Sequence, residues 1–173
     1  MSQLTGKQIE ELREGLRPTW YATRRGRRRA VALGAAALGC LWVSAAVCWF
    51  LAPSDTAMWT TFTLAAIGLV TYAFVFRVLV AATQGVVGLA DHDLDERQLA
   101  QRRHVYALAH RVSLWMLLVA AVLAGLLPDR GDHFLEVPSA AVVLFMGSIL
   151  TSHLIAPHLV AGWVMPDSPQ DDD

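Results

Sequence analysis

Four long stretches without Asp, Glu, Lys or Arg constrain the fold of this chain more than any other feature. They cover residues 30–54, 56–90 with one interruption at Arg77, 112–128 and 137–166. A helix that crosses a bilayer needs about 20 predominantly apolar residues. We therefore predict an all-α fold, an integral membrane four-helix bundle with helices near 30–51, 58–82, 110–127 and 138–160.

The composition excludes most other protein classes. The chain has 173 residues, of which 55% are apolar and 17% are charged, whereas a soluble domain carries roughly 45–50% apolar and about 25% charged residues. The net charge of −1 gives no indication of a nucleic-acid partner. Cys40 and Cys48 are about 12 Å apart along a helix, too far for a disulfide within it.

The distribution of basic residues predicts the orientation. If both termini are cytoplasmic, every Lys and Arg except Arg130 falls on the cytoplasmic side. Cytoplasmic loops of membrane proteins carry this excess of Lys and Arg. Because Arg outnumbers Lys strongly, as in high-GC bacterial genomes, we expect a multi-pass protein of a bacterial plasma (inner) membrane.

The two ends of the chain differ from the membrane domain, 30–165. Residues 1–29 predict a short cytoplasmic helix that ends before Pro18, followed by a basic segment with five arginines between residues 24 and 29. The acidic tail, 166–173, is expected to be disordered.

Small residues in two of the apolar stretches predict close helix packing. They are Gly34, Ala35, Ala36 and Gly39 in the first stretch, and Ala140, Ala141, Gly147 and Ser148 in the last. We expect these positions to serve the packing of the spanning helices.

The cytoplasmic loop 83–111 carries the most information. Its acids come first and its bases follow, in the order Asp91, Asp93, Asp95, Glu96, Arg97, Arg102, Arg103 and Arg111. This order suits a helix dipole, with Asp93 and Glu96 as a capping pair. No Gly or Pro occurs between residues 91 and 124, so we predict one helix over about 94–127. Its cytoplasmic part, a loop helix over 93–110, would extend from the membrane or lie on its surface.

The alternating acids of this loop also raise the possibility of a calcium site. An EF-hand loop needs Gly at position 6 and an acid at position 12. Here those positions hold Glu96 and Arg102, so no metal site is predicted.

The string Leu94-Asp95-Glu96-Arg97-Gln98 is followed by Arg102 or Arg103, Tyr106, Ala109 and Arg111, and then by an apolar helix. This pattern resembles a motif of small uncharacterised bacterial membrane proteins, many of them actinobacterial. The resemblance covers about 20 of the 173 residues. It implies a multi-pass membrane protein and no particular activity.

Three polar residues in or near the membrane are candidate functional residues: Arg77, His110 and His153. Arg77 lies close to the cytoplasmic interface, where its side chain can reach the headgroups. Two histidines on facing helices can ligate haem, although we expect His153 to lie deeper than His110. We predict no cofactor, with haem as the alternative.

No catalytic motif is visible, so we expect a protein that is not an enzyme. The leading hypothesis is an accessory or regulatory protein that binds a protein partner, or another copy of itself, through its charged cytoplasmic helix. The candidate contact residues are Asp93, Asp95, Glu96, Arg97, Arg102 and Arg103. The alternatives are a haem-binding electron carrier and a small oligomeric transporter, the latter weakened by the lack of a carboxylate in mid-membrane.

Overall fold

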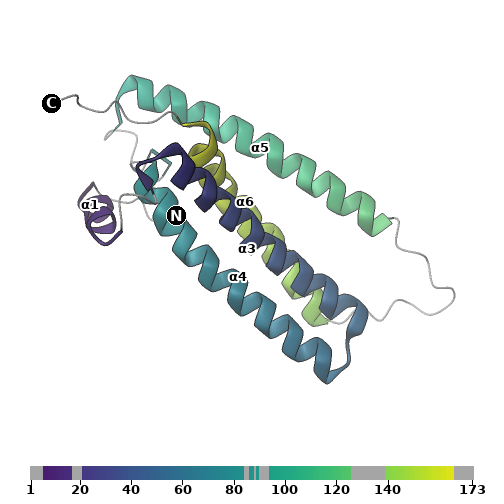
Figure 1. The fold of residues 1–173 in the computed structure, drawn as a ribbon. Coiled ribbons are helices and arrows are strands. Elements are labelled where there is room, and N and C mark those ends of the chain that lie inside the picture. The colour runs from purple at the N-terminus through teal and green to yellow at the C-terminus, as the bar shows by residue number, and fades with distance from the viewer. Residues whose placement is uncertain are drawn as a thin grey trace.

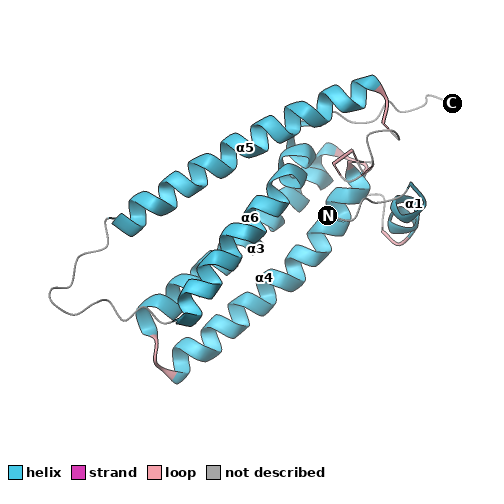
Figure 2. Ribbon diagram, turned by 180° about the vertical axis from the view of Figure 1, so that it is seen from behind, coloured by secondary structure: helices cyan, strands magenta, loops and turns pink. Residues whose placement is uncertain are grey.

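The computed structural model describes residues 6–16, 21–83, 86, 87, 89, 94–125 and 139–165. The helices are α1 (Gly6–Glu14), α3 (Arg24–Leu51), α4 (Asp55–Ala82), α5 (Glu96–Gly125) and α6 (Ser139–Val164), and the described residues form no strand (Figures 1 and 2). Four of these helices, α3 to α6, are long and apolar enough to cross a membrane. The predictions of an all-helical fold and of four helices that could span a membrane are therefore confirmed. Asp93, the loop 126–138 and the tail 166–173 lie outside the described residues.

The first spanning helix begins earlier than the sequence pattern suggested. α3 starts at Arg24, not near residue 30, because the Thr23 side chain accepts a hydrogen bond of 3.1 Å from the Gly26 amide. Thr is a favoured residue at a helix N-cap, where its oxygen satisfies a free amide. The arginine cluster is thus the first two turns of α3 and not a separate basic segment.

The start of α5 also differs from the expected capping pair. Asp95 caps the helix, because its Oδ1 accepts from the Gln98 amide at 2.6 Å while Gln98 Oε1 accepts from the Asp95 amide at 3.2 Å. This reciprocal pair is a capping box, shifted by two residues from the predicted pair of Asp93 and Glu96. From Glu96, α5 continues without a break to Gly125. The prediction of a single helix over about 94–127 is confirmed to within two residues at each end.

Three of the long helices form the core, and the fourth lies outside it. α3 packs along both α4 and α6, whereas α5 packs chiefly on α6 (Figure 1). Val75, Val78 and Leu79 of α4 are fully buried in this core. A third of the apolar windows of α3 and α4 is buried, against 17% of that of α5. α5 is therefore the least enclosed of the spanning helices.

Glycines set the closest approaches between the core helices. A Cβ on Gly162 of α6 would lie 2.6 Å from Leu79 Cδ2 and 3.0 Å from Val31 Cγ2. A Cβ on Gly34 of α3 would lie 2.8 Å from Leu159 Cδ2. The predicted close packing is found at Gly34, Ala141 and Ser148, which are buried. The other five small residues, Ala35, Ala36, Gly39, Ala140 and Gly147, are exposed.

The contacts between α5 and α6 fix how far α5 extends. Val105 packs with Ala161, in a cluster that includes Val87. Since α6 ends three residues after Ala161, at Val164, about the first six residues of α5, 96–101, extend past it. At 1.5 Å per residue this extension is about 9 Å long. Because the structure does not define where α5 leaves the membrane, the cytoplasmic loop helix over 93–110 stays a prediction.

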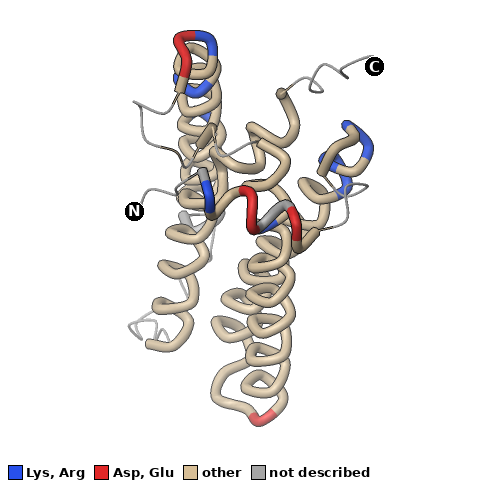
Figure 3. The backbone as a smooth tube through the Cα atoms, turned by 90° about the vertical axis from the view of Figure 1, so that its left-hand side faces the viewer, with Lys and Arg blue, Asp and Glu red and all other residues tan. Residues whose placement is uncertain are grey.

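Charged residues gather toward the end of the bundle where α3 and α5 begin and where α4 and α6 end, hereafter the basic end (Figure 3). Arg24, Arg25, Arg97 and Arg103 all lie within eight residues of these helix starts. At the opposite end, α4 begins with the acidic Asp55. Arg77 is an exposed residue five positions before the end of α4 at Ala82, close enough for its side chain to reach the interface.

Candidate functional site

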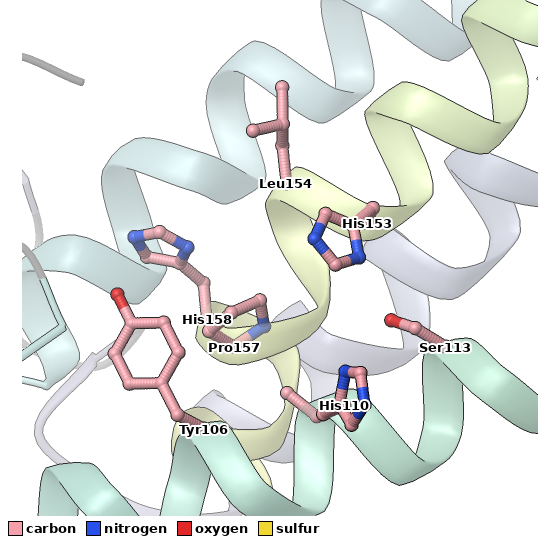
Figure 4. A pocket seen from close by; sticks show the side chains of 8 residues that line it. Tyr106, His110, Ser113, His153, Leu154, Pro157 and His158 are labelled. Atoms are coloured by element: carbon pink, nitrogen blue, oxygen red, sulfur yellow. The ribbon is translucent and has the colours of Figure 1, made fainter.

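A groove between α5 and α6 brings together three histidines, a tyrosine and a serine of these two spanning helices. Its volume is about 350 Å³, within the range of small-molecule sites, roughly 300–1,000 Å³. The residues that line it, hereafter the α5–α6 groove, are Tyr106, Ala109, His110 and Ser113 from α5 and His153, Leu154, Pro157 and His158 from α6 (Figure 4).

Helical spacing places the α5 residues on one face. Tyr106, His110 and Ser113 follow one another at intervals of four and three residues, and such residues are neighbours on a helix surface. Ala109 and Ser113 are buried, and His110 is exposed. On α6, His153 and Pro157 share a face in the same way. The groove therefore has a buried floor and an exposed rim.

His110 and His153 lie on facing helices and both line this groove (Figure 4). The register set by Val105 and Ala161 puts Ser113, not His110, opposite His153. The two histidines thus differ in depth by about one helical turn, in the direction that the sequence suggested. Despite this difference in depth, both histidines line the same cavity. Haem ligation by this pair stays a prediction.

His158 is a groove residue that was not among the candidates. It is 3% exposed, and its ring packs on Phe76 of α4 with ring centroids 4.8 Å apart. Its Nδ1 atom is buried and has no hydrogen-bond partner among the described residues. The Leu154 carbonyl, one turn earlier, interacts with the ring without hydrogen-bond geometry. His158 therefore forms part of the buried floor of the groove.

Pro157 interrupts the backbone hydrogen bonding of α6 beside the groove. It lies inside α6, and a proline has no amide hydrogen to give to the carbonyl four residues earlier. The carbonyl of His153 therefore loses its helical partner at the point where the His153 side chain enters the groove. The same stretch holds a further polar contact, because Trp42 of α3 donates from Nε1 to Ser152 Oγ at 3.1 Å.

The lining of the groove is mainly apolar, with a few hydrogen-bonding side chains and no charged residue. No Asp, Glu, Lys or Arg lines it. Within the described residues, no three His, Cys, Asp or Glu side chains lie close enough together to hold a metal ion. The groove can therefore supply hydrogen bonds and apolar contacts to a ligand.

The predicted partner-binding residues have two different structural roles. Asp95, Glu96, Arg97 and Arg103 are exposed at the start of α5. Arg102 instead donates from Nη1 to the Leu89 carbonyl at 2.8 Å, and its guanidinium lies 5.8 Å from the centre of the Tyr106 ring. The Tyr106 hydroxyl donates to the Val87 carbonyl at 3.3 Å. Arg102 thus holds Leu89, and with it the turn at Val86 and Val87, against α5.

We expect Arg102→Ala to release this turn, because a hydrogen bond from a charged group contributes about 1.5–3 kcal/mol. The amide of Val86, which donates to the Thr83 carbonyl at 3.0 Å, should then exchange its hydrogen roughly tenfold faster or more. Hydrogen-exchange mass spectrometry of the purified protein measures this rate. Arg103→Ala, which removes the same charge from an exposed neighbour, should leave it unchanged. If Arg102→Ala and Arg103→Ala accelerated exchange at Val86 equally, the cause would be the loss of a positive charge and not the loss of the Arg102 hydrogen bond.

Comparison with known protein families, with curated proteins and with solved structures finds no match for this chain.

Proposed function

We propose that this chain is a non-enzymatic accessory or regulatory protein of a bacterial plasma membrane, and that it binds a protein partner through the first turns of α5. In this proposal the basic end and both termini lie in the cytoplasm, in keeping with the excess of Lys and Arg there. The partner would contact Asp95, Glu96, Arg97 and Arg103.

The observation that carries the proposal is a charged arm fixed in position. Residues 96–101 extend about 9 Å beyond α6, and Glu96 and Arg97 are exposed on them. Directly behind the arm, Arg102 and Val105 anchor α5 to the 86–89 turn and to α6. A preorganised surface pays less entropy on binding than a flexible one. Opposite charges on neighbouring positions also favour a specific partner over non-specific attraction.

A photo-crosslinking experiment in native membranes tests the proposal. A photoreactive amino acid at Ala100, an exposed position of the arm, is expected to give one adduct with a second, different chain. The double reversal Arg97→Glu and Arg103→Glu should reduce that adduct at least tenfold, because it inverts the charges at the contact. Mass spectrometry of the adduct identifies the partner.

The matched control carries the same photoreactive amino acid at Thr60, an exposed position of α4 near the opposite end. It should not give this adduct. An adduct that survives the double charge reversal would contradict the proposed contact. An adduct with twice the mass of this chain would show that the first turns of α5 bind a second copy of the chain and not a different protein.

A further inference from the structure

The α5–α6 groove has the chemistry of a site for a neutral ligand. Its polar side chains are three imidazoles and the hydroxyls of Tyr106 and Ser113, and no charged residue lines it. A charged ligand would need an opposite charge in such surroundings, because burying an unpaired charge is very costly. An uncharged molecule with hydrogen-bonding atoms meets no such penalty.

The position of the groove points to a ligand that enters from the bilayer. His153 lies 14 residues after Ser139 and 11 residues before Val164, and hence more than about 16 Å from either end of α6. His110, His153 and Leu154 are exposed on the rim. Because these exposed residues belong to spanning helices, the groove opens toward lipid. A ligand that reaches it needs an apolar body.

The hydrogen-bonding groups lie on both walls. His110 and Ser113 point from α5, and His153 points from α6, toward the space between the two helices (Figure 4). A neutral imidazole and a hydroxyl can each donate one hydrogen bond and accept another. The His153 carbonyl, freed by Pro157, is an additional acceptor. A flat ring with one oxygen on each of two opposite edges would satisfy both walls at once.

We propose that the α5–α6 groove binds the head group of a membrane quinone. His110 and His153 would donate to its two carbonyl oxygens, and Ser113 would support the α5 side. The reduced form, a quinol, also carries two hydroxyl donors, which match the His153 carbonyl and an unprotonated imidazole nitrogen. The apolar tail would leave between the helices along Leu154 into the lipid. This site lies apart from the charged arm of α5 and does not depend on the partner proposed for it.

The probe for this site is decylubiquinone, added to the purified full chain in lipid nanodiscs. Binding is followed by tryptophan quenching, since Trp42 hydrogen-bonds to Ser152 next to His153. We expect saturable quenching in the wild type. His110→Leu and His153→Leu should each raise the dissociation constant at least tenfold, and Ser113→Ala should raise it less. The folded state of each variant is checked by far-UV circular dichroism and gel filtration.

His104→Leu is the matched control, because His104 is an exposed histidine of α5 that does not line the groove, and it should bind like the wild type. Quenching that stays unsaturated, or that is equal in all variants, would overturn the proposal. Stronger binding of oleate would show that the groove selects an anion, and would overturn it too. Another outcome is that the chain fails to bind decylubiquinone while added haem gives a Soret shift. If His110→Leu or His153→Leu abolishes that shift, the groove is a haem site and the quinone proposal is overturned.

Discussion

Replacing Gly162 by leucine is expected to lower the free energy of unfolding by about 1–3 kcal/mol, the usual cost of overpacking a well-packed core. A Cβ at this position already lies 2.6 Å from Leu79 Cδ2 and 3.0 Å from Val31 Cγ2. Leu79 is fully buried, so it has little room to move away. The leucine would therefore push α6 from both α3 and α4. The measurement is unfolding by sodium dodecyl sulfate in mixed micelles, followed by circular dichroism.

Gly147→Leu is the matched control in the same helix. A Cβ on Gly147 meets nothing within 4 Å, and glycine costs a helix interior about 1 kcal/mol relative to alanine. This variant should be as stable as the wild type or slightly more stable. Gly162→Ala should fall between the two, since Leu79 Cδ2 is the end of a flexible side chain. If Gly147→Leu were as destabilising as Gly162→Leu, close helix contact at Gly162 would not be the cause.

The apolar stretches were sufficient to predict four spanning helices, because the length of an uncharged run is a strong and local signal. The helix starts were less predictable. Thr23 and Asp95 became N-caps, and each cap depends on one side-chain oxygen reaching one amide. The first spanning helix was predicted to start near residue 30, six residues too late, since hydropathy does not distinguish a helical arginine cluster from a basic loop. Asp93 and Asp95 both precede a suitable partner three residues later, and the predicted pair, Asp93 with Glu96, was two residues away from the capping box of Asp95 and Gln98.

The α5–α6 groove could be predicted in part. The spacing of Tyr106, His110 and Ser113 places them on one face of a helix, and this signal was present in the sequence. The pairing of that face with His153 required the register between α5 and α6, which Val105 and Ala161 set through contacts between distant residues. The burial of His158 against Phe76 depends on a third helix. Such long-range packing leaves no trace in local periodicity.

The roles of the individual arginines also depend on contacts between distant residues, so the sequence could not distinguish them. Arg97, Arg102 and Arg103 belong to one charged helix, yet Arg102 holds a neighbouring turn while the other two face outward. In α3, Arg27 is buried, whereas Arg25 and Arg28 are exposed. The number of basic residues at each end predicts the orientation of the chain in the membrane. It does not show which arginine makes a contact that stabilises the fold.

Arg27→Met is expected to destabilise the protein by about 1.5–3 kcal/mol, the usual contribution of a hydrogen bond from a charged group. Arg27 is 3% exposed, and its Nη2 donates to the Met165 carbonyl at 3.0 Å. Met165 directly follows α6, so the guanidinium supplies a donor and a positive charge at the negative end of that helix. Methionine keeps the packing of the aliphatic part of the side chain but removes the hydrogen-bond donor and the positive charge. Unfolding in mixed micelles measures the loss, and hydrogen exchange should show faster opening of the last turn of α6.

Arg25→Met removes the same charge from an exposed position of the same helix. Both variants change the count of basic residues equally, so any effect on membrane orientation is shared between them. Arg25→Met should keep the wild-type free energy of unfolding to within about 0.5 kcal/mol, as surface substitutions usually do. Arg27→Lys should fall between Arg27→Met and the wild type, because lysine keeps the charge and loses the planar fork of donors. Equal destabilisation by Arg25→Met and Arg27→Met would trace the effect to the charge of the basic end and not to the contact with α6.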